Sequence, residues 1–223
     1  MTNNSLENIK DINKKRKSIA REYAEAIFIA LLLALFIRTF VIQAFKIPSG
    51  SMEDTLLIGD HILVSKFAYG NHIPNEIPFF NIKLFDDIIL FPKLPERGDI
   101  IVFKYPKDES RDFIKRVIGI PGDLLEVKHQ KVIINGKPYV DPFARHIESP
   151  SDSPLVPRDD FGPVLVPDGH LFMMGDNREN SQDSRYWGFL DSNKVRGKAL
   201  VIYWSWNQLE SWVRFERFGK ILE

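Results

Sequence analysis

The pattern of apolar and polar positions divides the chain into one long apolar segment near its start and many short apolar runs after it. The long segment, residues 24–45, reads AEAIFIALLLALFIRTFVIQAF. As an α-helix it would be about 33 Å long, enough to cross the hydrocarbon core of a bilayer. Arg38 interrupts the segment, but its long side chain reaches the far interface from the last turns of such a helix. The sequence therefore predicts a transmembrane anchor over residues 23–45.

A cleaved secretory signal would share the basic start and the apolar centre, and the small residues at 49–51 would suit a cleavage site. A retained anchor is favoured, because Arg38 and the aromatic residues that follow it make a poor approach to such a site. Residues 46–65 contain only one Lys or Arg, Lys46. The segment is preceded by six basic side chains, Lys10, Lys14, Lys15, Arg16, Lys17 and Arg21. By the positive-inside rule, residues 1–22 are predicted to be a cytoplasmic basic tail.

After residue 46 the chain consists of short apolar runs rich in β-branched and aromatic residues, which predict strands. The runs are HILVSKFAY from 61, DIIVFKY from 99, RDFIKRVIGI from 111, DLLEV from 123, KVIINGKPYV from 131, HLFMMG from 170 and KALVIYWSW from 198. Asn135-Gly136 predicts a tight hairpin, since both residues tolerate a positive φ. Two stretches lack this pattern and are expected to be irregular: a loop over 70–95 and a segment with six prolines over 141–168.

The sequence therefore predicts a mainly β fold of antiparallel β-sheet, preceded by one N-terminal transmembrane helix. Composition narrows the chemistry. The 223 residues include 30 Lys+Arg and 30 Asp+Glu. The chain therefore lacks the excess of basic residues that is typical of nucleic-acid-binding proteins. There is no cysteine, which excludes disulfides, thiol nucleophiles and thiolate metal sites. No His-Glu-x-x-His motif is present, and neither a metal nor a cofactor is expected.

The stretch KIPSGSMEDTL, residues 46–56, follows the anchor directly and contains Ser51. It is either a flexible joint or the position of a nucleophile. Serine can be activated by a neutral lysine, and burial among apolar groups favours the neutral form. Lys115 fits this requirement, because strand alternation places it between Phe113 and Val117 on one face. Taken alone, however, a lysine in a strand is more commonly solvated on an edge. A triad based on His170 is not favoured, because the chain has no G-x-S-x-G motif.

The stretch GDNRENSQDSRYWG, residues 175–188, is dense in charged and amide side chains. A solvated surface loop is the simplest interpretation. The alternative is a hydrogen-bonded scaffold that supports a site, in which Asp183 and Arg185 pair and Arg116 is a further partner. Ser181 would then be a donor or acceptor to a catalytic group.

Taken together, PSGSM after an anchor, FIKRVIGIPGD from 113, GDNRENSQDSRYWG from 175 and RGDIIVFKYP from 97 resemble the bacterial type I signal peptidases. The resemblance runs from about residue 30 to 205. It implies that Ser51 is the nucleophile and Lys115 the general base. By the same resemblance Ser49 contributes to the oxyanion hole and Ser181 orients the lysine. The supporting ion pair would be Asp183 with Arg185, and Arg116 would lie beside it.

The resemblance also implies a substrate, an exported preprotein that is cleaved after an Ala-X-Ala-like site through an acyl-enzyme. The shallow substrate groove would be formed by Ile47, Pro48, Met52, Phe113 and Ile114. Further implied partners are membrane lipid and a nearby export translocon. The implied location is the bacterial inner membrane, with the N-terminus cytoplasmic and the catalytic domain on the outer, periplasmic face.

The family fold divides the exported part into a catalytic β core, residues 46–123 and 168–223, and a smaller inserted β region over 124–167. One departure from the family pattern is Asp54, where a proline is common. Two alternatives to a general signal peptidase remain open. One is a dedicated processing protease of the same family with few substrates. The other is an inactive, membrane-anchored peptide-binding β-domain.

Overall fold

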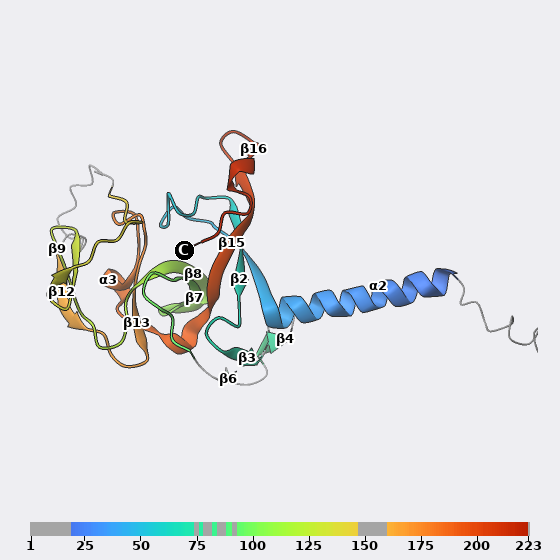
Figure 1. Ribbon diagram of the computed structural model, residues 1–223, viewed down its shortest axis with the longest axis horizontal. Helices are drawn as coiled ribbons and strands as arrows, with labels where there is room; N and C mark the ends of the chain where they lie inside the picture. Colours follow the sequence, from blue (N-terminus) through green and yellow to red (C-terminus); the bar gives the residue numbers. More distant parts are fainter. Residues whose placement is uncertain are drawn as a thin grey trace, which may run out of the picture. The chain divides into compact units, whose positions relative to one another are not determined.

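A computed structural model describes residues 19–73, 76–77, 82–83, 88–90, 93–146 and 160–222 (Figure 1). Most of the predicted basic tail, residues 1–18, lies outside the described residues. Contacts divide the chain into two units, Met1–Arg38 and Thr39–Glu223, and each is described by itself.

The first unit contains helix α2 (Ile19–Phe36), which continues as the π-helix η1 (Ile37–Val41). The stretch Ile19–Val41 has a mean hydropathy of 2.2 and is long and apolar enough to cross a membrane. The predicted anchor end at Phe45 needs a correction. Residues Ile42–Lys46 form strand β1, because their backbone groups pair with β2 instead of continuing the helix.

The second unit is built on a large antiparallel sheet, with strand order β1-β2-β15-β7-β8-β13-β14 and β16 paired to β15. Its strands after β1 are β2 (Asp60–Ser65), β7 (Ile100–Tyr105), β8 (Asp108–Gly119), β13 (His170–Met174), β14 (Leu190–Asp191), β15 (Val195–Asn207) and β16 (Trp212–Val213). The predicted strands at these positions are confirmed, and so is the mainly antiparallel β fold. In Figure 1, β7 lies beside the long strand β15, and β8 follows on the other side of β7.

A second antiparallel sheet has the order β11-β10-β9-β12. It comprises β9 (Leu124–Lys128), β10 (Lys131–Ile134), β11 (Lys137–Pro138) and β12 (Phe161–Leu165). The predicted hairpin is confirmed, since Asn135 and Gly136 both have positive φ, 54° and 76°. Strand β12 lies within a segment expected to be irregular. Its pairing with β9, a partner distant in sequence, makes it a strand.

The stretch expected to be a loop over 70–95 contains short strands among its described residues. Strand β3 (Asn71–Ile73) pairs with β6 (Ile88–Leu90), and β4 (Glu76–Ile77) pairs with β5 (Ile82–Lys83). The described residues also contain three short helices: α3 (Ser184–Trp187), η2 (Ser192–Lys194) and η3 (Phe215–Arg217).

The burial pattern of β8 changes along its length, and this change decides where Lys115 lies. The first five residues of β8 are exposed, whereas the residues from Ile114 to Gly119 are buried. The buried half pairs on one side with β7 and on the other with β13. Lys115 is therefore placed at the point where the strand enters the core.

Candidate active site

Ser51 lies in a turn that the core holds at both ends. On its N-terminal side, the backbone N–H of Ile47 donates to the carbonyl of Asp60 at 2.8 Å. Within the turn, the N–H of Leu56 donates to the carbonyl of Met52 at 2.7 Å, and both of these side chains are fully buried. Two apolar side chains pointing into the core therefore fix the backbone that carries Ser51.

The structure brings Ser51 and Lys115 together from positions 64 residues apart in the chain. Lys115 Nζ lies 2.7 Å from Ser51 Oγ and donates to the carbonyl of Ile114 at 3.0 Å. Only 4% of Lys115 is exposed. This burial lowers the pKa of Lys115 from 10.5 to about 8, and the nearby carboxylates of Asp183 and Asp176 oppose the effect. The amine is therefore tuned toward the range in which a lysine acts as a base.

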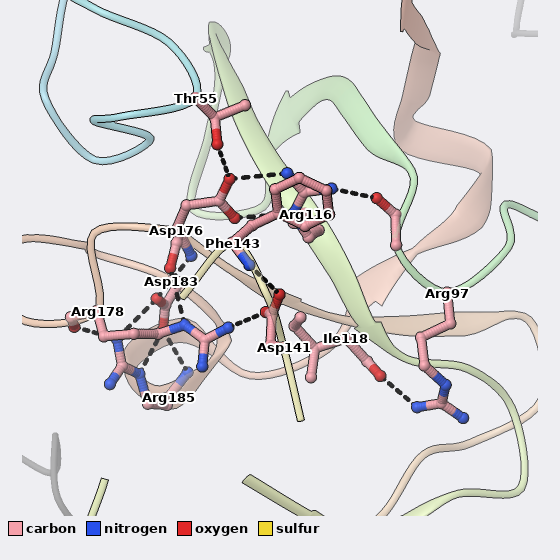
Figure 2. A network of polar contacts seen from close by, with 12 residues as sticks. Thr55, Arg97, Arg116, Ile118, Asp141, Phe143, Asp176, Arg178, Asp183 and Arg185 are labelled. Atoms are coloured by element: carbon pink, nitrogen blue, oxygen red, sulfur yellow. Dashed lines mark hydrogen bonds and ion pairs between the residues drawn. The ribbon is translucent and has the colours of Figure 1, made fainter. Parts of the chain in front are cut away.

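Asp176 is the centre of a buried polar network behind the two residues (Figure 2). Its carboxylate accepts two hydrogen bonds from the guanidinium of Arg116, at 2.9 and 2.8 Å. It also accepts a bond of 2.6 Å from Thr55 Oγ1. Arg116 follows Lys115 in β8, and Thr55 belongs to the same turn as Ser51. One carboxylate therefore connects the strand that carries the lysine to the turn that carries the serine.

Asp183 and Arg185 form the predicted ion pair, with Arg185 Nε 2.9 Å from Asp183 Oδ1. Asp183 also caps helix α3 and accepts a bond of 3.1 Å from the N–H of Gly175. A side chain at Gly175 would collide with Ser181 Oγ and with the carbonyl of Ser51. The loop thus approaches Ser51 closely, at a residue without a side chain. Arg116, which was expected beside this pair, forms its own bidentate ion pair with Asp176.

The two other serines of the predicted site differ in environment. Ser49 is exposed, whereas Ser181 is buried at 5% exposure. Within the described part of the chain, Ser181 Oγ makes no hydrogen bond. Both residues line the same cavity as Ser51 and Lys115.

This cavity has a volume of about 680 Å³ and opens beside Ser51 Oγ. It is lined by Pro48, Ser49, Ser51, Arg111, Asp112, Phe113, Ile114, Lys115, Glu179, Asn180, Ser181, Gln182 and Tyr186. Of the predicted groove residues, Pro48, Phe113 and Ile114 lie here. Ile47 and Met52 do not, and this corrects the prediction: they are 2% and 0% exposed and pack in the core, where they fix the Ser51 turn.

The structure places several further residues at the site that the sequence analysis did not identify. Thr55 and Asp176 belong to the stretches that carried the motif, and only their burial distinguishes them from surface residues. Arg111 and Tyr186 line the cavity and could be found only from the fold. Among the described residues there is no group of three or more His, Asp or Glu side chains suited to a metal ion.

A serine hydroxyl next to a buried lysine amine is an arrangement that can activate the serine as a nucleophile, as in serine hydrolases. The sequence matches the family described as "Signal peptidase, peptidase S26" over residues 20–204. The chain belongs to this signal peptidase family, and it is a membrane-anchored serine endopeptidase.

The chain is similar to known signal peptidases over most of its length. It is 34% identical over 245 residues to Signal peptidase I from Pseudomonas fluorescens, covering 96% of this chain and 82% of that protein. It is 38% identical over 206 residues to Probable signal peptidase I-2 from Synechocystis sp., covering 88% and 80% of the two chains. A solved signal peptidase I from Enterococcus faecalis V583 is 32% identical, with a TM-score of 0.40, covering 48% of this chain and 97% of that one.

Proposed function

We propose that the protein removes N-terminal signal peptides from exported preproteins, cleaving after Ala-X-Ala-like sites by a Ser51/Lys115 dyad. The observation that carries this proposal is the distance of 2.7 Å between Ser51 Oγ and the buried Lys115 amine, whose pKa is lowered to about 8. A lysine with its ordinary pKa would be almost entirely charged near neutral pH and would not accept a proton.

Acylation requires a proton transfer along this contact. When the amine is neutral, the Ser51 hydroxyl donates to Lys115 Nζ, and Oγ attacks the carbonyl carbon of the scissile bond. The oxyanion accepts hydrogen bonds from the Ser51 N–H and the Ser49 hydroxyl. The ammonium of Lys115 then gives its proton to the leaving amine as the carbon–nitrogen bond breaks. An acyl-enzyme remains. Lys115, neutral again, takes a proton from a water that attacks the acyl carbon, and this proton passes to Ser51 Oγ as the ester bond breaks and the signal peptide leaves as a carboxylate.

The other polar residues of the site have supporting roles in this proposal. Ser181 lines the same cavity, and its Oγ makes no hydrogen bond among the described residues, so this hydroxyl is available to orient the lysine amine. Asp183 and Arg185 hold the loop that carries Ser181, while Arg116 and Asp176 hold the strand beside Lys115. Their charges are buried in pairs, which avoids the large cost of an unpaired buried charge.

The substrate is proposed to bind as an extended strand along β8. Strand β13 pairs with β8 at Arg116, Val117 and Gly119, so the first half of β8 has β7 as its only strand neighbour among the described residues. Main-chain hydrogen bonds to an open edge give affinity, and pockets for alternate side chains give specificity. The cavity beside Pro48, Phe113 and Ile114 is the proposed place for the small residues before the bond.

Lipid is proposed as a second partner. The stretch from Tyr203 to Ile221 in unit 2, which includes the end of β15, β16, η3 and the turns around them, exposes many large apolar side chains. They are Tyr203, Trp204, Trp206, Leu209, Trp212, Phe215, Phe218 and Ile221. Exposed apolar surface of this extent is typical of a surface that meets another apolar phase, and tryptophan is enriched at membrane interfaces.

With the basic tail cytoplasmic, the catalytic unit acts on the periplasmic face of the inner membrane, near the export translocon.

The test is cleavage of a preprotein whose signal ends in Ala-X-Ala, with the full chain in detergent or lipid. We expect Ser51→Ala and Lys115→Ala to abolish cleavage, because neither group has a substitute. Lys137→Ala, an exposed lysine of β11, is the matched control and should cleave normally. Cleavage by Lys115→Ala would refute the dyad. A folded wild type that binds the peptide without cleaving it would indicate a peptide-binding domain instead.

A further inference from the structure

A short segment of the inserted region, residues 141–146, lies across the network that supports the active site (Figure 2). Asp141 forms an ion pair with Arg178, and both side chains are buried at 2% and 4% exposure. The ring of Phe143 lies against the guanidinium of Arg116, with 3.9 Å between the ring centre and the guanidinium carbon. A stacked arginine face and a buried ion pair are both favourable contacts that fix geometry. The segment is therefore attached to the catalytic core and not only to its own sheet.

The backbone of Arg145 strengthens this attachment. Its N–H donates to the carbonyl of Asp176 at 2.7 Å, and its carbonyl accepts from the N–H of Arg178 at 3.0 Å. The residue between these two partners, Asn177, donates its own N–H to the carbonyl of Ser51 at 3.2 Å. Arg145 thus forms an isolated β-bridge with Asn177, and Asn177 in turn contacts the backbone of the nucleophile.

The side chain of Arg145 extends from this fixed backbone to the turn of the nucleophile. Its Nη1 donates to Asp54 Oδ1 at 2.6 Å and lies 3.8 Å from Glu53 Oε2. Asp54 has a φ of 77°, the left-handed region that aspartate tolerates and proline, with φ fixed near −65°, does not adopt. The turn therefore lacks the fixed φ that a proline would give at position 54. The ion pair between Asp54 and Arg145 restrains this position instead.

The part of the turn that contains Asp54 and Thr55 lies beside a cavity. A cavity of about 500 Å³, separate from the one that contains Ser51, lies between the turn, the 141–146 segment and the end of the chain. Its lining includes Asp54, Thr55, Arg145, Lys220 and Leu222. Met52 and Leu56 anchor the turn in the core, whereas the side chain of Asp54 lies beside this volume, is 63% exposed and forms an ion pair with Arg145.

We propose that Arg145 is a positioning residue for the nucleophile, which it places against the Lys115 amine by holding Asp54. This inference rests on the proposed dyad. Arg145 and Asp54 do not line the cavity beside Ser51, so they are expected to affect the chemical step and not substrate affinity. The side chains are 32% and 63% exposed, so the pair by itself contributes little to stability.

The test is a double-mutant cycle with Arg145→Gln and Asp54→Asn on the full chain in detergent micelles. Both substitutions remove charge while retaining polarity, and asparagine tolerates the left-handed conformation. We expect each single variant to lower kcat by about three- to tenfold with KM within about twofold. This range lies between the effect of an exposed ion pair and the roughly 100-fold effect of a 1 Å displacement. The double variant should be no slower than the slower single variant, since both remove one contact.

Three controls separate positioning from general stability. Lys194→Gln removes an ion pair of similar exposure with Glu109, 28% and 56%, and should leave kcat unchanged. Arg145→Lys, which keeps the charge, should recover most of the activity. The midpoint of the pH–kcat/KM profile, which reports the pKa of the free enzyme, should stay near pH 8 in all variants, because Arg145 is not among the groups that shift Lys115.

The outcomes are distinct. If Arg145→Gln keeps a normal kcat while Ser51→Ala is inactive, the positioning role is refuted and the dyad is retained. Additive losses in the cycle, or a loss confined to thermal stability, refute it equally. If Ser51→Ala or Lys115→Ala cleaves like the wild type, the dyad itself is refuted.

Discussion

Replacing Lys115 by methionine measures the burial of its amine through stability instead of catalysis. The pKa of Lys115 is lowered from 10.5 to about 8, mainly because burial removes the ammonium from water. Between those two pH values the unfolded chain holds one more proton than the folded chain. The free energy of unfolding of the wild type therefore rises with pH through this window. Below pH 8 the folded protein carries the full cost of the buried charge, and above 10.5 it carries none.

The size of this effect follows from the pKa values. One pKa unit corresponds to about 1.4 kcal/mol, so the buried charge costs about 3 kcal/mol below pH 8. Methionine avoids this cost at every pH, but it leaves Ser51 Oγ and the carbonyl of Ile114 without their partner. Each lost bond costs about 1 kcal/mol. We therefore expect Lys115→Met to be about 1 kcal/mol more stable than the wild type at pH 7 and about 2 kcal/mol less stable at pH 10.5.

The assay is guanidinium unfolding of the full chain in detergent micelles, followed by tryptophan fluorescence at pH 7, 8, 9 and 10.5. Groups that titrate in both proteins cancel in the difference between variant and wild type. Lys137→Met, at an exposed position, should differ from the wild type by the same amount at every pH. A stability difference for Lys115→Met that is constant from pH 7 to 10.5 would show that the amine is hydrated in the folded protein. That result would refute the argument for a lowered pKa.

Three further substitutions test the scaffold, each by activity and by thermal unfolding in detergent. Gly175→Ala should lower kcat by about 100-fold, because the added Cβ collides with the carbonyl of the nucleophile; a kcat within twofold of the wild type would contradict the close approach. Thr55→Val should cost about 1–3 kcal/mol, since Asp176 loses a buried donor, and Thr55→Ser should restore the stability. Arg217→Met should cost up to about 3–5 kcal/mol, because the buried carboxylate of Asp60 loses its 2.6 Å ion pair and is left with the more distant Arg214, at 4.0 Å; no measurable loss of stability would contradict this reasoning.

The sequence by itself determined the presence of the apolar anchor helix, the main strands of the large sheet and the identity of the dyad candidates. A 23-residue apolar helix needs no tertiary partner to be recognised, because the bilayer imposes its length. Strands with apolar runs are equally local signals, and the Asn135-Gly136 turn follows from the φ values that these two residues tolerate. Ser51 and Lys115 were found because their motifs are specific in residue type and order.

Other features depend on partners that no local pattern names. Strand β12 exists because β9 offers it backbone hydrogen bonds, and strand β1 ends the helix early for the same reason with β2. The family resemblance implied that Ile47 and Met52 line the substrate groove. In the structure both side chains are buried in the core, where they fix the Ser51 turn.

Only the tertiary structure decided how the polar residues are shared. Arg116 pairs with Asp176, 60 residues away, and Thr55 completes the same carboxylate from the nucleophile's turn. Arg145 reaches Asp54 across 91 residues of sequence, a contact between two ordinary surface residue types. The pKa of Lys115 is set in the same way, because burial is a property of everything packed around the amine. Sequence names the reacting groups, whereas their distance and dielectric surroundings arise only when distant segments pack together.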